Sequence, residues 1–256
     1  MACSLFDMTG KTAVVTGSTK GIGRAIASAL AEAGARVVIS SRKQEACDAV
    51  AAEIRTKGHD ASAVACHIGK KEDLQRLVST VGRIDVLVCN AAVNPYYGPT
   101  SGLTDDAFAK VMDTNVRGNL WLCNMVIPQM AERRDGTVVI VSSIAGFKGT
   151  DKLGVYAISK AADMQLARNL AVEWGPSNVR VNCIAPGIVR TDFARALWEN
   201  PEILKAAVST YSLRRIGEPE DVAGVAVMLA SRAGAWITGQ TIVVDGGYLA
   251  GGGGGI

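Results

Sequence analysis

Seven short runs of β-branched and aliphatic residues, separated by stretches with helical spacing of apolar residues, constrain the fold of this chain most strongly. Runs such as residues 138–141, which are Val-Val-Ile-Val, are apolar throughout, as expected for strands buried on both faces of a parallel sheet. Strands that alternate with helices predict a doubly wound α/β fold: a seven-stranded parallel sheet with helices on both faces. The predicted strands are residues 12–17, 36–41, 61–68, 85–90, 137–143, 180–185 and 241–245.

Length and composition indicate one catalytic domain over residues 1–256. The chain is 48% hydrophobic, enough for a substantial core, and nothing in it demands a second domain. Its formal net charge of +3 is small and spread along the sequence, which argues against a nucleic-acid or anionic-membrane partner. No apolar run approaches the ~18 residues of a membrane span, and no signal segment is evident, so we expect a soluble, unprocessed protein that acts on a small molecule.

Cysteine and histidine usage favours a cytoplasmic protein with no catalytic metal. The six cysteines form no Cys-x-x-Cys pair, and several fall in apolar runs where a buried thiol behaves as a small hydrophobe. The only histidines are His59 and His67, and no His/Cys cluster has metal-ligand spacing. The thiols therefore fit a reducing cytoplasm, and we predict no metal in the chemistry.

A glycine-rich loop joins the first predicted strand to a helix. Such a loop presents backbone N–H groups and the positive end of the helix dipole to a phosphate, so it predicts a pyrophosphate site; a tight turn is the alternative. The glycine spacing, Gly-x-x-x-Gly-x-Gly, differs from the Gly-x-Gly-x-x-Gly of the general dinucleotide fingerprint, although both are glycine loops between a strand and a helix. Asn90, at the end of the fourth predicted strand, should border the same cofactor. The loop residues are Gly17, Ser18, Thr19, Lys20, Gly21, Ile22 and Gly23.

The end of the second predicted strand favours NADP(H) over NAD(H). An NAD site places an acid there, about 20 residues past the loop, to hold the ribose 2′-hydroxyl. This chain has Ser40-Ser41-Arg42 instead. The forked guanidinium of Arg42 and the ammonium of Lys20 would suit a 2′-phosphate, unless both are simply solvated surface cations.

Tyr156 and Lys160 are four residues apart in a predicted helix, which places both side chains on one face. A cation at about 5 Å with an effective dielectric near 20 is worth about 3 kcal/mol, or roughly two pKa units, to a phenolate. We therefore expect Lys160 alone to bring the Tyr156 phenol close to working as a base near neutral pH. The pairing would often arise by chance, but rarely together with the glycine loop.

With these motifs in place, the chain resembles the short-chain dehydrogenase/reductase family from Thr16 to Gly247. That family has a Rossmann-type version of the doubly wound fold. The resemblance rests on the glycine loop, Asn90-Ala91-Ala92, Asn115-Val116, Ser142-Ser143, Tyr156 with Lys160, Pro186-Gly187 with Thr191, and Asp245-Gly246-Gly247. Within the family the chain looks most like the NADPH-dependent carbonyl reductases of the animal peroxisomal type, at residues 40–43, 66–70 and 90–95.

The resemblance implies a catalytic set of four residues. Tyr156 would be the acid that protonates a carbonyl oxygen as hydride arrives, or the base in the reverse oxidation. Lys160 would lower the pKa of the phenol and bind the nicotinamide ribose. Ser143 would donate a hydrogen bond to the substrate oxygen, and the backbone of Asn115 would hold a relay water.

The resemblance also implies the rest of the cofactor site. His67 stands where the family usually has an acid that bonds the adenine amine; a neutral imidazole could accept the same bond, and a plain surface histidine is the alternative. The remaining implied NADP(H) contacts are Ser41, Arg42, Ile68, Asn90, Ala91, Ala92, Pro186, Gly187, Val189 and Thr191.

A substrate lid is expected at about residues 188–214, where this family has one. Phe193 and Trp198 would close over the ligand, and Asn94, Tyr96 and Phe147 would form the opposite wall, near Ser143 and Tyr156. The pocket should suit a small apolar ketone, aldehyde or quinone, or the matching alcohol; packing within the protein is the alternative role for the aromatics. A glycine-rich tail, residues 251–256, should be mobile.

The family further implies a homotetramer, built through long helices at about residues 105–133 and 155–174 and through the last strand. The nearest rival activity is a 3-oxoacyl thioester reductase, which shares the catalytic set. Those enzymes commonly dock acyl carrier protein on two arginines, and this chain has Arg134 at one position but Ser177 at the other. A secondary-alcohol or sugar dehydrogenase remains open, as does, more remotely, a non-catalytic dinucleotide-binding sensor or scaffold.

Overall fold

A computed structural model of the chain describes residues 4–251. Seven parallel strands form one sheet in the order β3-β2-β1-β4-β5-β6-β7, so the predicted single-domain, doubly wound fold is confirmed. The chain reverses direction across the sheet between β1 and β4, which leaves a crevice at the carboxyl ends of these two strands. The strands are β1 (Thr12–Thr16), β2 (Arg36–Ser40), β3 (Ala61–Ala63), β4 (Val86–Cys89), β5 (Gly136–Val141), β6 (Val179–Pro186) and β7 (Thr241–Val244).

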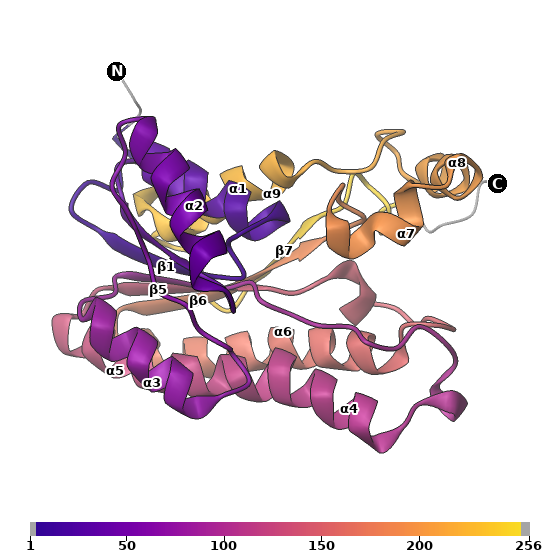
Figure 1. Cartoon of the computed structure of the whole chain (residues 1–256), viewed down its shortest axis with the longest axis horizontal. Coiled ribbons are helices and arrows are strands. Elements are labelled where there is room, and N and C mark those ends of the chain that lie inside the picture. The colour runs from indigo at the N-terminus through magenta and orange to yellow at the C-terminus, as the bar shows by residue number, and fades with distance from the viewer. Residues whose placement is uncertain (1–3, 252–256) are drawn as a thin grey trace.

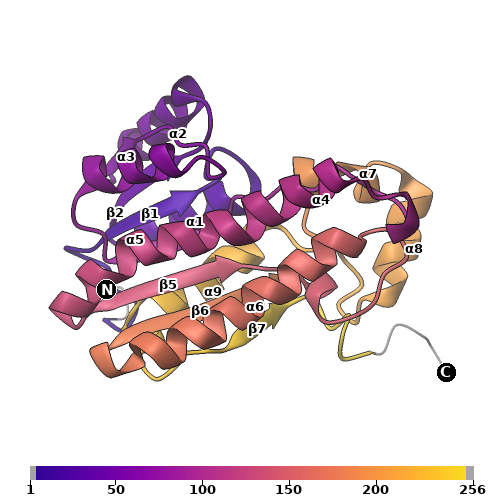
Figure 2. The same cartoon turned by 90° about the horizontal axis from the view of Figure 1, so that it is seen from below.

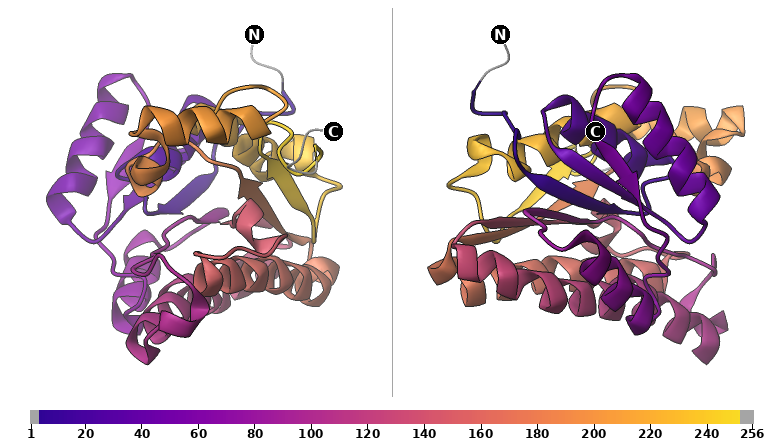
Figure 3. Two further views of the ribbon diagram at one scale, coloured as in Figure 1. Left: turned by 90° about the vertical axis from the view of Figure 1, so that its right-hand side faces the viewer. Right: turned by 60° about the vertical axis from the view of Figure 1, so that its left-hand side comes forward.

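Helices cover both faces of the sheet, in the three layers seen in Figures 1 and 3. On one face pack α1 (Gly21–Glu32), α2 (Gln44–Thr56) and α9 (Pro219–Ala230); on the other pack α3 (Lys71–Val81), α5 (Gly118–Arg133) and α6 (Gly154–Trp174). Beyond the carboxyl end of the sheet stand α4 (Asp105–Met112), α7 (Arg195–Trp198) and α8 (Pro201–Thr210).

The sheet separates two hydrophobic cores because side chains alternate between its faces. In β5, Val139 and Val141 join the core under α1 and α9, whereas Val138 and Ile140 join the core under α5 and α6. All four are buried, and the same alternation runs through the other central strands. The continuous apolar runs in the sequence are therefore explained by burial on both faces.

Two predicted elements differ from the structure. The third strand, predicted to reach residue 68, ends at Ala63 as a regular strand. Past it the amides of Val64 and Cys66 still donate to the carbonyls of Ile39 (3.0 Å) and Ser41 (2.9 Å), while the Ala65 amide on the open edge donates to the Gln44 side chain (2.8 Å). The chain then turns toward the cleft. The helix predicted over residues 105–133 is divided by a π-helical turn, Asp113–Arg117, between α4 and α5. Figure 2 shows this composite helix running beside α6. Most of the predicted glycine tail, residues 252–256, lies outside the described residues.

The amino-terminal edge of the sheet is held by one buried carboxylate. Asp85, just before β4, accepts hydrogen bonds from the backbone N–H of Thr12 (2.9 Å) and from the Arg83 guanidinium (2.9 and 3.0 Å). A second guanidinium, that of Arg133, lies 3.8 Å away. The carboxylate thus ties the starts of β1 and β4 together, at the edge opposite the cleft.

Within residues 4–251, no helix is long and apolar enough to cross a membrane. The cysteines of this part, Cys47, Cys66, Cys89, Cys123 and Cys183, are buried with free thiols, and no cluster of acidic, histidine or cysteine side chains there could hold a metal ion.

Candidate active site

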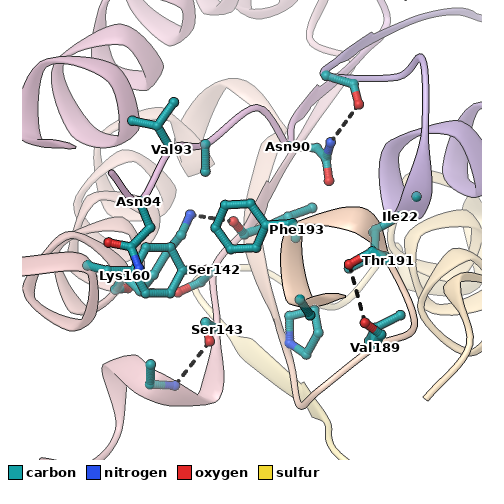
Figure 4. Close-up of a pocket in the computed structure, with 18 of the residues that line it drawn as sticks. Ile22, Asn90, Val93, Asn94, Ser142, Ser143, Lys160, Val189, Thr191 and Phe193 are labelled. Carbon is teal, nitrogen blue, oxygen red and sulfur yellow. Dashed lines mark hydrogen bonds between the residues drawn. The ribbon is translucent and has the colours of Figure 1, made fainter. Parts of the chain in front are cut away.

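A cleft of about 1030 Å³ opens at the carboxyl ends of the strands and receives the segments that follow β1, β2, β4, β5 and β6 (Figure 4). It brings together most of the residues that the sequence predicts for cofactor, substrate and chemistry. These are Gly17, Thr19, Lys20, Gly21, Ile22, Gly23, Ser41, Arg42, His67, Ile68, Asn90, Ala91, Ala92, Asn94, Ser143, Tyr156, Lys160, Pro186, Gly187, Val189, Thr191 and Phe193.

The glycine loop has a backbone shape that requires glycine. Gly17 and Gly21 have φ values of +66° and +55°, which side chains disfavour. A Cβ on Gly23 would collide with the Asn90 amide and with the Gly17 carbonyl. Asn90 fixes the loop by donating to the carbonyls of Thr16 (3.0 Å) and Gly17 (3.2 Å). This close-approach loop at the start of α1 fits the pyrophosphate of a dinucleotide.

The two cations predicted to face a 2′-phosphate are placed differently. Arg42 lines the cleft just past β2, is exposed, and has no carboxylate partner among the residues described. Lys20 also lines the cleft, but its ammonium pairs with Asp192 at 3.1 Å, and both side chains are exposed. Arg42 is therefore the better-placed cation for a phosphate, because its donors are not already engaged.

Tyr156 and Lys160 project from the first turns of α6, where the Ser142 hydroxyl donates to the backbone carbonyl of Lys160 (2.7 Å). The Lys160 side chain is 2% exposed, and its Nζ lies 5.7 Å from the centroid of the Tyr156 ring. That Nζ donates to the Val141 carbonyl and to Asp163 Oδ2, each at 2.9 Å. The predicted pair is thus assembled, but its ammonium is shared with a carboxylate.

Burial and neighbouring charges act in opposite directions on the phenol of Tyr156. Burial, the largest influence, raises its pKa, whereas the Lys160 ammonium and the Ser143 hydrogen bond lower it; the Asp163 charge raises it further. The expected effect of Lys160 is therefore present, but helix spacing showed neither the burial nor the acid beside the lysine, and both oppose it.

Two residues that the sequence reasoning missed complete this network. Asp163 is fully buried, and its Oδ1 accepts a hydrogen bond from Asn119 Nδ2 at 3.1 Å. The same Nδ2 donates to the backbone carbonyl of Asn115 at 2.6 Å. A signal was present in the sequence: Asp163 stands one position before Met164 and four before Ala167, on the face of α6 that packs against the sheet, where only apolar residues are expected.

Asn115, predicted to carry a relay water on its backbone, lies fully buried in the π-helical turn and does not line the cleft. Its side chain bonds both backbone groups of Val93 (2.9 and 3.0 Å) and the Ser159 hydroxyl (3.1 Å). These bonds, not helix propensity, account for an asparagine at this position. Its backbone carbonyl accepts a hydrogen bond from Asn119 Nδ2 (2.6 Å).

Four other predicted site residues do not line the cleft. The Ser18 hydroxyl is buried between Val15 O (2.6 Å) and the amide of Ser40 (2.9 Å). The Tyr96 hydroxyl turns to Pro99 O at 2.8 Å, and Trp198 Nε1 donates to Thr191 O at 2.9 Å. Phe147 is 48% exposed on the outside of its turn. Polar atoms of the first three meet nearby backbone groups, which draws their side chains away from the cavity.

The segment over residues 188–214 carries α7 and α8 beyond the carboxyl end of the sheet (Figure 1), and residues such as Phe193, Leu197 and Ile203 of this segment line the cleft. The Phe193 ring lies 5.8 Å from that of Tyr156, centroid to centroid, tilted by 40°. Lys148 and Tyr248, which the sequence reasoning did not select, also line the cavity, where the Lys148 ammonium donates to the Tyr248 hydroxyl (2.6 Å). The sequence holds no cue for that pair, because its members are a hundred residues apart.

Comparisons with known proteins give one consistent family. The family model described as "Enoyl-(Acyl carrier protein) reductase" matches residues 17–249. Among curated relatives, "Dehydrogenase/reductase SDR family member 4" from Bos taurus is 46% identical over 243 residues, which are 93% of this chain and 87% of the relative. The protein of the same name from Homo sapiens is 45% identical over 244 residues, covering 94% of this chain and 88% of the relative.

Solved structures of similar fold include dehydrogenases, in agreement with these relatives. A putative gluconate dehydrogenase from Agrobacterium tumefaciens superposes with a TM-score of 0.93 at 32% identity, covering 97% of this chain and 99% of that one. A gluconate 5-dehydrogenase from Burkholderia cenocepacia, solved in complex with NADP and tartrate, superposes at 0.92 with 28% identity, covering 98% and 99%. The glycine loop, the Tyr156–Lys160 pair and these matches have one explanation: the chain belongs to the short-chain dehydrogenase/reductase family.

Proposed function

We propose that this enzyme reduces small apolar carbonyl compounds to alcohols with NADPH, and that Tyr156 is its proton donor. The class of reaction follows from the family: the chain is an NAD(P)-dependent oxidoreductase that interconverts a carbonyl group and an alcohol. Three of the solved relatives are described with NADP bound, and the chain binds NADP(H). The observation that carries the proposal is Tyr156, which lines an apolar cleft together with Ser143 and the Lys160 ammonium.

The residues divide the work by position. The glycine loop and α1 would hold the pyrophosphate, Arg42 the 2′-phosphate, and the segment after β6 the nicotinamide end. Bound NADPH supplies the hydride. Ser143 Oγ accepts from the Ala145 amide (3.1 Å), which leaves its own proton for the substrate oxygen. Tyr156 then donates its proton to the oxygen as negative charge develops there.

The substrate end of the cleft favours an apolar carbonyl compound. Phe193 packs against Tyr156, and Leu153, Leu197 and Ile203 line the same space. We propose that residues 188–214 act as a lid that closes on the ligand and excludes water. Of the predicted substrate residues, Asn94, Ser143, Tyr156 and Phe193 are the ones in reach.

Acyl thioester reduction is less well supported as the alternative. The Arg134 guanidinium, at one of the two positions expected to dock a carrier protein, donates to the backbone carbonyl of Pro176 (3.1 Å). The second position is Ser177, which has no charge to offer a phosphopantetheine-bearing acidic partner. Comparing turnover of a 3-oxoacyl thioester with that of an aryl ketone separates the two activities.

We also propose a cytoplasmic homotetramer. Apolar side chains are exposed on the two surfaces where the family expectation places subunit contacts. On α4, α5 and α6 these are Phe108, Leu120, Ile158 and Val172, the last 81% exposed; beside β7 they are Val243 and the fully exposed Trp236. Buried free thiols suit the reducing cytoplasm. Light scattering of the purified protein would test the tetramer.

Replacing the proton donor tests the function. In Tyr156→Phe we expect kcat for NADPH-dependent reduction of aryl ketones and quinones to fall on the order of 10³-fold, with NADPH affinity changed by less than about threefold, because only the acid is lost. Tyr96→Phe is the matched control, since its hydroxyl bonds Pro99 O outside the cleft. Full turnover in Tyr156→Phe would contradict the proposal.

A second variant tests the 2′-phosphate site. In Arg42→Ala we expect NADPH to bind 10- to 100-fold more weakly, roughly the worth of charge-assisted hydrogen bonds, while NADH binding stays unchanged. Lys43→Ala is the control, because this neighbouring cation does not line the cleft. Fluorescence titration of both cofactors measures the effect. Equal weakening in the two variants would show general electrostatic attraction and no specific site.

A further inference from the structure

We propose that Asp163 is a positioning residue of the reaction, which holds the Lys160 ammonium in place beside Tyr156 and balances its charge. The inference rests on the proposed role of Tyr156 as the acid. It extends the predicted pair to a buried triad of one phenol, one ammonium and one carboxylate, all within two turns of α6.

Geometry makes the Lys160–Asp163 contact the main constraint on the ammonium. Its Nζ is 2.9 Å from Asp163 Oδ2 and 2.9 Å from the Val141 carbonyl, and the lysine and aspartate side chains are 2% and 0% exposed. Asn119 Nδ2 holds the other carboxylate oxygen, and that amide is itself oriented by the Asn115 carbonyl. Among the described residues, the Lys160 ammonium is the cation that pairs with this carboxylate, so its charge acts at short range on the pair.

The sign of the effect follows from charge alone. A negative charge beside two groups opposes loss of a proton from either, whether the phenol becomes phenolate or the ammonium becomes amine. The Asp163 charge raises the pKa of Tyr156 and, with burial opposing it, the pKa of Lys160. Because the two groups titrate as a coupled pair, removal of the carboxylate lowers the first pKa of the pair, whichever group gives up the proton.

Other titratable groups that face Asp163 do not supply this charge. Cys183 on β6 donates its thiol to the Asp163 carbonyl (3.4 Å), and Cys89 on β4 lies in the same core. Burial raises the pKa of Cys183, and a hydrogen bond with Cys123 and burial raise that of Cys89, so both thiols stay neutral. Asp163 is thus the anion that balances Lys160.

The test is Asp163→Asn, which keeps the shape and an acceptor for Lys160 but removes the charge. We expect the alkaline limb of the kcat profile for carbonyl reduction to move down by about one pH unit or more. Glu173→Gln, an exposed acid on the same helix, is the control for net charge and should leave the limb in place. A uniform fall in kcat with an unmoved limb would show a purely structural role and overturn the proposal.

A second readout needs no turnover. The ultraviolet absorption of tyrosinate without cofactor should show Tyr156 ionising at a higher pH in the parent than in Asp163→Asn, with Tyr156→Phe as the baseline for each. Ionisation at the same pH in both would overturn the proposal. Its failure is distinct from that of the proposed function: an active Tyr156→Phe removes both, whereas an inactive Tyr156→Phe with an unmoved Asp163→Asn limb removes only the role of Asp163.

Discussion

Two buried carboxylates, Asp85 at the amino edge of the sheet and Asp163 near the cleft, have pKa values shifted in opposite directions. Both side chains are almost inaccessible, at 2% and 0%. Burial raises the pKa of Asp85, but the hydrogen bonds from Arg83 and from Thr12 N–H together bring it below its usual range. Burial also raises the pKa of Asp163, and there Lys160 and Asn119 do not offset it.

The difference lies in the partners. Asp85 has a guanidinium that is itself 58% exposed, so only one side of that pair is desolvated, and a backbone N–H completes the site. Asp163 has an ammonium that is as buried as itself. Desolvating two charges commonly costs more than their attraction returns. Asp85 therefore stabilises the fold, whereas Asp163, together with its buried partner Lys160, lowers the stability of the folded chain. A role of Asp163 in catalysis would explain why a carboxylate stands there.

The largest effect should come from separating the buried pair. Asp163→Leu leaves the Lys160 ammonium without its carboxylate, and we expect the free energy of unfolding to fall by about 3 kcal/mol. Adding Lys160→Met should restore stability to within about 1 kcal/mol of the parent or above it, with no activity, because the two charges are then absent together. Urea denaturation measures both variants. A double variant as unstable as the single one would contradict the comparison.

A smaller effect is expected at the amino edge. Asp85→Asn should lower the free energy of unfolding by about 2 kcal/mol, because charge-assisted hydrogen bonds to Arg83 and Thr12 are weakened, while turnover stays near that of the parent. Asp135→Asn is the control: its ion pair with Lys11 is on the surface, and the loss should stay below about 1 kcal/mol.

The pH dependence of that difference sharpens the contrast. Because the folded pKa of Asp85 is below its unfolded value of about 3.9, its contribution is complete above that value and is lost as pH falls through the folded pKa. The gap between the parent and Asp85→Asn should therefore narrow from neutral pH to about pH 3. A gap that stays constant would mean that the carboxylate charge is not its source.

The sequence predicted the fold well because the burial of a strand is visible in the residue types of that strand alone. A doubly buried strand such as residues 138–141 must be apolar at every position, and a loop with the φ values of Gly17 and Gly21 must use glycine. The order of the strands and the cleft then follow from how a parallel sheet is connected. The third strand was overestimated only as a regular element: the amides of Val64 and Cys66 still bond the neighbouring segment, while the Ala65 amide bonds the Gln44 side chain, a contact between elements that local sequence does not show.

The site was predicted less completely, for the same reason. Motif spacing brings Tyr156 and Lys160 together along one helix, but the carboxylate next to the lysine matters only through burial, which spacing does not show. Tyr96 and Trp198 were assigned to the pocket by their place in the family pattern, yet their polar atoms bond to nearby backbone carbonyls and their side chains do not line the cleft. Lys148 and Tyr248 meet only in three dimensions.

The π-helical turn at Asp113–Arg117 determines the rotational phase of α5 relative to α4. A residue in a regular helix advances by about 100°, so the one additional residue in this turn rotates all of α5 by that angle relative to an uninterrupted helix. Asn119, one residue into α5, meets Asp163 only in this phase. The composite helix therefore contains one inserted residue. That insertion turns Asn119 toward Asp163, the carboxylate that pairs with Lys160.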